Sequence, residues 1–244
     1  MHNPDEQAVV VKLRQHYQAH FERLFGPNAL DDVDTAYALM AQAIAEYERS
    51  SEVCRFDSKY DQHVADPGEV LLSDSELRGL ELFTGKAKCK NCHSMDTTPA
   101  GKALFTNFGH QNIGVPKNPD NPFYFLPADL NPDGADYVDL GLGGFLDDPN
   151  EYGKFKIPSL RNVAITAPYM HNGVFRTLKE VVHFDNTRDV ASWPPSEVSM
   201  NVHRHMPPMP NTFGRLGLTD EEEDDIIAFL MTLTDGYVHE PAGP

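Results

Sequence analysis

Three shortages in this sequence each exclude a class of protein. Only three cysteines occur among 244 residues, and the second Cys–Cys or Cys–His pair that would complete a structural zinc site is missing. No apolar run approaches the ~18 residues of a membrane-spanning helix, so we expect no membrane span. Lys and Arg number 20 against 37 Asp and Glu, and the net charge of −17 argues against a nucleic-acid partner.

Two of the three cysteines lie in the run Cys89-Lys90-Asn91-Cys92-His93, which is typical of covalent haem attachment. Two thiols at this spacing can add to the vinyl groups of a haem, and the adjacent histidine then ligates the iron. A thioredoxin-type pair would follow a strand, whereas the residues before Cys89 have a helical pattern. The run therefore predicts one covalent haem c, held by Cys89 and Cys92, with His93 as the iron ligand. The third cysteine, Cys54, is expected to be a small buried side chain.

Haem c attachment also bears on compartment and partner. It normally takes place outside the cytoplasm, so we expect a periplasmic protein. Residues 2–11 do not contain a charged start followed by an apolar region, which indicates that a signal peptide was removed or that this N-terminus is internal. The acidic charge favours a basic redox partner, either a small cytochrome c or a cupredoxin.

Apolar residues recur at helical spacing along much of the chain. Residues 7–25 place large apolar side chains four apart before Gly26, and residues 31–49 repeat the pattern, so both segments are predicted helices. Three capping boxes predict the starts of three more helices, at Ser73 with Glu76, Thr177 with Glu180 and Thr219 with Glu222. Residues 97–156 and 193–213 have no such pattern. The first is predicted to be a long ordered loop and the second an irregular segment. The fold class is mainly α.

The sixth position of the iron decides between electron transfer and reaction with peroxide. One residue breaks the pattern of the predicted helix after Thr177, because Asp185 falls on its apolar face. A carboxylate there is costly unless it is paired, hydrated or facing a cofactor. Alternatively, the helix has already ended, and Asp185 and Asn186 form a turn. Composition leaves many other candidate ligands: Met95, Met170, Met200, Met206, Met209, His110, His171, His183, His203 and His205.

Two further motifs, together with the runs at 89–93 and 177–186, resemble the bacterial di-haem cytochrome c peroxidase and MauG family. They are Phe-Lys-Ile-Pro-Ser-Leu-Arg-Asn-Val at 155–163 and Thr-Ala-Pro-Tyr-Met-His-Asn-Gly at 166–173. The resemblance covers essentially the whole chain. It implies a cytochrome c-like haem domain at 66–244, preceded at 1–65 by a helical segment similar to the end of the family's N-terminal domain. The family's first CxxCH run is absent, so we expect the first haem domain to be missing, through shortening, processing or a true one-haem design.

The resemblance also implies roles for particular residues. The distal ligand of the C-terminal haem is Met in the family's peroxidases and Tyr in MauG, and this position corresponds to Asp185 here. The family's calcium ion implies a site at the backbone carbonyls of Thr166 and Pro168. We expect the haem to be surrounded by further members of these motifs, with catalytic roles for Arg161 and His171 beside Asp185, and haem contacts for Tyr169 and Met170.

These observations predict a haem c redox protein, with electron transfer or peroxide-dependent oxidation at the haem on His93. A peroxidase-type oxidoreductase, or a domain of one, is the expected class. The alternative is a non-enzymatic electron carrier whose iron is closed by a methionine such as Met206 or Met209. A third possibility is a MauG-like oxidase acting on a protein substrate, which requires a second haem domain.

Overall fold

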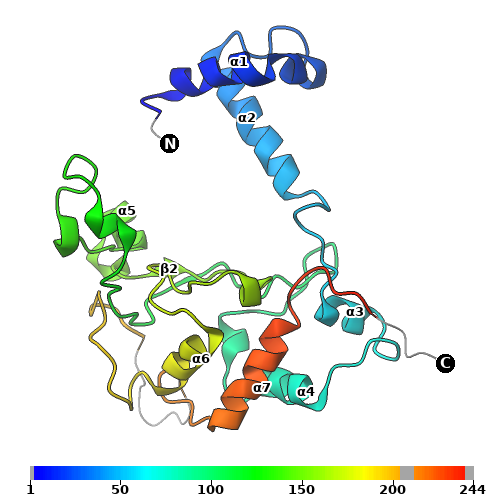
Figure 1. The fold of residues 1–244 in the computed structure, drawn as a ribbon, viewed down its shortest axis with the longest axis vertical. Coiled ribbons are helices and arrows are strands. Elements are labelled where there is room, and N and C mark those ends of the chain that lie inside the picture. Colours follow the sequence, from blue (N-terminus) through cyan, green and yellow to red (C-terminus); the bar gives the residue numbers. More distant parts are fainter. Residues whose placement is uncertain (1–2, 204–211, 240–244) are drawn as a thin grey trace. The chain divides into compact units, whose positions relative to one another are not determined.

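The computed structural model describes residues 3–203 and 212–239 and divides the chain into two compact units, 1–55 and 56–244 (Figure 1). Unit 1 contains α1 (Glu6–Phe25) and α2 (Val33–Glu48). The side chains of Asp5 and Asp32 cap the two helices by accepting backbone amides of the first turn. Both helices confirm the sequence prediction. They enclose a small core of Val10, Phe21, Ala29, Leu30 and Ala36.

Cys54 lies near the end of unit 1 and is half-buried, not fully buried as its composition-based reading predicted. Its thiol donates to the carbonyl of Glu48, with 3.0 Å between sulfur and oxygen. The segment after α2 therefore leaves this thiol partly open to solvent.

Unit 2 is built on helices that come together from distant parts of the chain. They are α3 (Lys59–Ala65), α4 (Asp74–Thr84), α5 (Leu142–Leu146), α6 (Leu178–Thr187) and α7 (Asp220–Met231). Helix α7 packs against both α4 and α6. All three predicted capping boxes are present, because Ser73, Thr177 and Thr219 each exchange hydrogen bonds with the glutamate three residues later. The mainly helical fold class is confirmed.

An aromatic cluster forms the core of unit 2. The rings of Phe83, Phe105 and Phe229 are almost fully buried and contact one another at centroid distances of 5.2–6.3 Å. Tyr60 of α3 joins this cluster through edge contacts with Phe105 at 5.3 Å and Phe229 at 5.8 Å. Because α3 packs into this core, it belongs to unit 2, which begins at residue 56, and the domain boundary at 65 stays a prediction.

The predicted long loop is ordered by short elements. These are η1 (Cys89–Asn91), β1 (His110–Gln111), η2 (Pro122–Phe125), η3 (Gly134–Asp136), η4 (Pro149–Glu151), β2 (Phe155–Lys156) and η5 (Val163–Ile165), with β1 and β2 antiparallel. Buried asparagine side chains replace regular backbone pairing in this region. Asn112, Asn118, Asn131 and Asn172 each donate to backbone carbonyls of distant or neighbouring turns.

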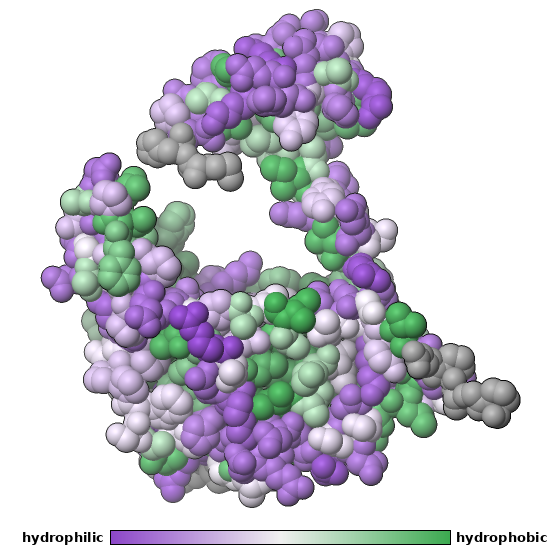
Figure 2. Space-filling view, viewed as in Figure 1, coloured by the Kyte–Doolittle hydropathy of each residue, from purple (hydrophilic) through white to green (hydrophobic). Residues whose placement is uncertain are grey.

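The hydropathy of the visible surface is mixed. Hydrophilic residues cover much of unit 2 in this view, and a group of hydrophobic residues lies in the middle of its visible face (Figure 2). Among the described residues, no helix has the length and apolar character needed to cross a membrane.

Candidate haem attachment site

The predicted attachment run follows directly from α4. The amide of Gly85 closes that helix on the carbonyl of Glu81, and Lys88 then adopts a left-handed conformation, with φ of 56°, that turns the chain into η1. The amide of His93 donates to the carbonyl of Cys89 at 2.9 Å. This helical turn holds the two thiols and the imidazole together on one short segment.

The two thiols lie in an apolar and acidic environment. Cys89 packs against the aromatic core of unit 2, and burial raises the pKa of its thiol to about 12, with the nearby charge of Asp185 acting in the same direction. Burial and Asp185 also raise the pKa of the Cys92 thiol. A reactive redox pair needs a lowered thiol pKa. The environment therefore disfavours a thioredoxin-like role and suits thiols that become covalent anchors.

His93 is held in the form that a metal ligand requires. Its Nδ1 atom lies 2.9 Å from the carbonyl oxygen of Phe105, and burial lowers the pKa of the imidazole. Hydrogen bonding to the backbone of Phe105 and Pro158 opposes this lowering. In a neutral ring that donates from Nδ1 to a carbonyl, the lone pair is on Nε2, the nitrogen that can ligate iron. Phe105 is itself fully buried, so the core fixes the orientation of the ring.

Asp185 lies close enough to both thiols for its charge to act on them. Helix α6 continues through Asp185 and Asn186, so the alternative that these residues form a turn is wrong. Burial raises the pKa of Asp185 to about 8, and only the opposing charge of Arg188 lowers it. Its Oδ1 atom is buried and has no hydrogen-bond partner in the part of the chain that the structure describes. Such an orphaned oxygen near both attachment thiols fits a site that a haem and its distal ligand would fill.

The other predicted catalytic residues have partners elsewhere in unit 2. Arg161 is buried and forms ion pairs with Asp61 of α3 and Asp235, while its guanidinium lies 4.7 Å from the ring of Phe56. It therefore ties α3 to the segment after α7. Neither the ion pairs nor the ring contact of Arg161 involves Asp185.

The Pro-Tyr-Met-His motif is fixed mainly by its own neighbourhood. The hydroxyl of Tyr169 donates to the carbonyl of Val163 at 2.9 Å, and Met170 has a left-handed backbone with φ of 69°. His171 stacks on Phe155 with ring centroids 3.6 Å apart, and its Nε2 atom lies 3.6 Å from a carboxylate oxygen of Glu197. Burial lowers the pKa of His171 against the opposing charge of Glu197.

The remaining candidate ligands are scattered. Met95 packs against the core, Met200 is 49% exposed, and His183 donates to or accepts from Glu223 at 2.9 Å. His110 belongs to β1, and the amide of His203 donates to the carbonyl of Asn112. His205, Met206 and Met209 lie outside the described residues.

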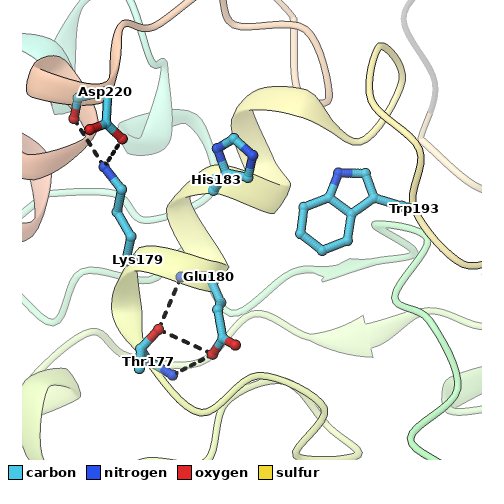
Figure 3. Close-up of a pocket in the computed structure, with 6 residues that line it drawn as sticks. All are labelled: Thr177, Lys179, Glu180, His183, Trp193 and Asp220. Carbon is cyan, nitrogen blue, oxygen red and sulfur yellow. Dashed lines mark hydrogen bonds and ion pairs between the residues drawn. The ribbon is translucent and has the colours of Figure 1, made fainter.

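A surface pocket of about 350 Å³ lies beside α6 (Figure 3). His183 and Trp193 face it together with Lys179, which pairs with Asp220. Positions 183 and 185 point to opposite sides of a helix, so this pocket and Asp185 are separated by α6 itself. The pocket is not the predicted haem site.

Sequence reasoning missed two residues of the site. The Phe105 carbonyl that orients His93 is a backbone group, for which sequence offers no pattern. Arg188 follows Asp185 by about one helical turn, and its charge acts on that carboxylate. This spacing was the one feature of the sequence that could have indicated the interaction.

Comparison with known proteins agrees with this geometry. Residues 77–234 match the family model described as Cytochrome c, and residues 1–69 match the model described as Di-haem cytochrome c peroxidase. The methylamine utilization protein MauG of Paracoccus denitrificans is 37% identical over 95% of this chain and 61% of its own length. The cytochrome-c peroxidase IdrP1 of Denitromonas iodatirespirans is 29% identical over 98% of this chain and 60% of its length.

A solved structure gives the same result. The diheme peroxidase BthA from Burkholderia thailandensis superposes with a TM-score of 0.76 and 33% identity, covering 96% of this chain and 60% of that one. The chain thus spans about 60% of the length of these relatives. The match over residues 77–234 contains Cys89, Cys92 and His93, which supports haem c as the cofactor. The chain belongs to the cytochrome c family, and it is similar to the di-haem cytochrome c peroxidases and MauG.

Proposed function

We propose that this chain is a periplasmic haem c redox protein that carries out electron transfer or peroxide-dependent oxidation at a haem held by Cys89, Cys92 and His93. One observation carries the proposal. A core-anchored His93 lies on the same short segment as two thiols of raised pKa, and the nearby Asp185 has a buried Oδ1 atom without a hydrogen-bond partner among the described residues. The similarity to MauG and to cytochrome c peroxidases supports the same reaction class.

Each residue of this region has a separate task. Cys89 and Cys92 anchor the group, and His93 ligates from a ring that the Phe105 carbonyl orients. When bound, haem c supplies an iron that exchanges electrons and, if its sixth position is open, reacts with peroxide. Asp185 is suited to holding a water molecule or a proton on its free oxygen, Oδ1, at the distal side.

The residues of the neighbouring motifs support this region from a distance. Arg161 fixes α3 and the C-terminal segment through its two carboxylate partners. Tyr169 and His171 hold their loop through the Val163 carbonyl and Glu197, and this loop carries Met170. We infer that they position the haem pocket and do not take part in the reaction.

A calcium site at the carbonyls of Thr166 and Pro168 is part of the proposal. Both residues are exposed, and no backbone amide of the described residues donates to either carbonyl. Free carbonyl oxygens are ligands that calcium accepts. The described residues contain no group of three or more His, Cys, Asp or Glu side chains arranged for a metal, so the proposed site relies on carbonyl oxygens and water.

The sequence contains one CxxCH run, so we propose that this chain carries one haem. A second haem domain, a small redox protein or a protein substrate would then complete the reaction from outside these 244 residues. The partial coverage of the relatives is consistent with such a division.

The test is the spin state of the ferric holoprotein before and after Asp185→Ala. We expect the absorption and electron paramagnetic resonance spectra to differ between the wild-type protein and Asp185→Ala, because the substitution changes the distal side of the iron. We also expect the wild-type holoprotein to react with hydrogen peroxide. His183→Ala is the matched control, because His183 lies on the same helix but faces the surface pocket. A low-spin spectrum that Asp185→Ala leaves unchanged, with no peroxide reaction, would instead identify an electron carrier closed by a methionine.

A further inference from the structure

The lysines of this acidic chain are concentrated in three stretches that contain no Asp or Glu. The stretches are 82–95, 97–119 and 152–179, and they hold eight of the ten lysines. The net charge of −17 is therefore unevenly distributed along the sequence, although in the fold Lys86, Lys154 and Lys179 pair with the carboxylates of Glu222, Glu151 and Asp220. The first stretch contains the haem attachment run itself.

The fold brings the three stretches together beside that run. The amide of Asn107 donates to the carbonyl of Cys92 at 3.0 Å, and its side chain donates to the carbonyl of Asn91 at 3.2 Å. Antiparallel pairing of β1 with β2 then places His110 opposite Lys156. The Nζ atom of Lys156 lies 5.4 Å from the ring centroid of Phe108.

These contacts define a continuous exposed surface, the lysine strip, made of Lys90, Asn91, Asn107, Phe108 and Lys156. It begins inside the attachment run, because Lys90 and Asn91 lie between the two cysteines. The strip is thus the outer surface next to the thiols that would hold the haem. Short distance to the cofactor is the main requirement of an electron-transfer contact surface.

Phe108 is the unusual member of the strip. It is 56% exposed, and its φ of 57° lies in the left-handed region that bulky side chains rarely adopt. The fold enforces this conformation, since the Phe108 amide donates to the Thr106 hydroxyl, which itself donates to the Ile157 carbonyl at 2.7 Å. Strained backbone that presents an aromatic ring to solvent is typical of binding surfaces.

We propose that the lysine strip is the docking surface for an acidic electron-carrying protein, and this inference rests on the proposed function. Lys90 and Lys156 would steer an acidic surface toward the haem edge, and Phe108 would supply the apolar contact at its centre. One electron passes from the reduced metal of the partner to the ferric iron, with no bond or proton transferred. The partner's charge is opposite to the one that the net charge of the chain predicts.

The experiment measures reduction of the ferric holoprotein by reduced protein probes in a stopped-flow instrument. The acidic probe is a cupredoxin with an acidic surface patch, and the basic probe is mitochondrial cytochrome c. We expect the acidic probe to react faster at low salt, and its rate to fall about tenfold when salt is raised to screen the charges. Lys90→Glu with Lys156→Glu should slow it at least about tenfold.

Two further variants sharpen the test. Lys12→Glu makes on α1 the charge change of one of these two substitutions, so its effect is compared with that of Lys90→Glu alone, and it should leave the rate within about twofold. Phe108→Asn tolerates the left-handed backbone, so it removes the ring without unfolding the turn, and it should slow the acidic probe while preserving the salt dependence. A faster reaction with the basic probe, or rates that Lys90→Glu and Lys156→Glu leave unchanged, would overturn the proposal.

A second readout separates this inference from the proposed function. Peroxide consumption with a small neutral phenol as electron donor does not require a docking surface. If the phenol reaction persists in all variants while the protein probes show no preference, the docking surface is wrong and the haem chemistry stands. If the wild-type holoprotein neither reacts with peroxide nor accepts electrons from either probe, both proposals fail.

Discussion

At the scale of single residues, the environment of Asp185 depends on one arginine. The guanidinium of Arg188 is nearly buried and pairs with Asp189, and its charge opposes the rise in the pKa of Asp185. It also holds the walls of the region, by donating to the carbonyls of Ile113 and His203 and lying 4.9 Å from the ring of Phe213. We regard Arg188 as a positioning residue for the distal carboxylate.

Arg188→Met tests this role. We expect the free energy of unfolding to fall by ~2–4 kcal/mol, because two backbone carbonyls and Asp189 lose a charged donor. The haem spectrum should also change, because Asp185 loses the nearby positive charge of Arg188. Arg188→Lys keeps that charge and should restore part of the stability and part of the spectrum. Denaturant unfolding and the absorption spectrum of the ferric holoprotein measure the two effects. A lower free energy of unfolding without a change in the haem spectrum would show that Arg188 has a purely structural role.

Residue-level prediction from sequence is possible where the cofactor dictates spacing and stops where tertiary contacts decide. The Cys89, Cys92 and His93 run is set by the dimensions of a haem, so it is visible in the sequence. The partners of Arg161, in contrast, are Asp61 and Asp235, which lie far from it along the chain. No local pattern could separate a haem-facing arginine from one that ties two segments together.

At the scale of elements, helix starts were predictable and short elements were not. A capping box depends on four consecutive residues, and each of the three predicted boxes is present. The strands β1 and β2 contain two residues each and are stabilised by their mutual pairing, so they have no periodic pattern to detect. The loop region that is ordered by buried asparagine side chains has no periodic sequence pattern either.

The crossing of α4 and α7 depends on a missing side chain. A Cβ atom at Gly79 would lie 1.9 Å from the backbone carbonyl oxygen of Asp225. We expect Gly79→Ala to force the helices apart and to lower the free energy of unfolding by ~3 kcal/mol or more, as overpacking does. Gly68→Ala is the control, because its Cβ would meet only a side-chain oxygen at 3.5 Å. Equal melting temperatures for the two variants would contradict the close crossing.

The same helix pair predicts a loss of stability in acid. Hydrogen bonds from Arg78 and Ser75 lower the pKa of Asp225, so the folded state favours its charged form. This stabilisation is complete above the unfolded pKa of about 4 and disappears as the pH falls through the lower folded value. Asp225→Asn should reduce stability at neutral pH and flatten this part of the acid dependence. Thermal melts of both proteins between about pH 2.5 and 7 measure it. Parallel curves would show that Asp225 does not contribute.

At the scale of the whole molecule, the two units differ in what holds them together. Unit 1 relies on five buried apolar residues between two helices, whereas unit 2 has an aromatic core in contact with the haem attachment run. A core of that size gives a small independent unit little stability. Haem attachment through Cys89 and Cys92 adds covalent bonds and apolar contacts within unit 2. The division of the chain therefore predicts two separate unfolding events.

We expect calorimetry of the full-length holoprotein to show a weaker transition for unit 1 and a stronger one for unit 2. Phe21→Ala, in the core of unit 1, should lower only the first transition, and Phe229→Ala should lower only the second, each by ~3–5 kcal/mol. Replacing both Cys89 and Cys92 by serine prevents covalent attachment and should also lower only the second. If either phenylalanine substitution shifted a single shared transition, the units would unfold cooperatively, and residues 1–55 would derive their stability from the haem domain.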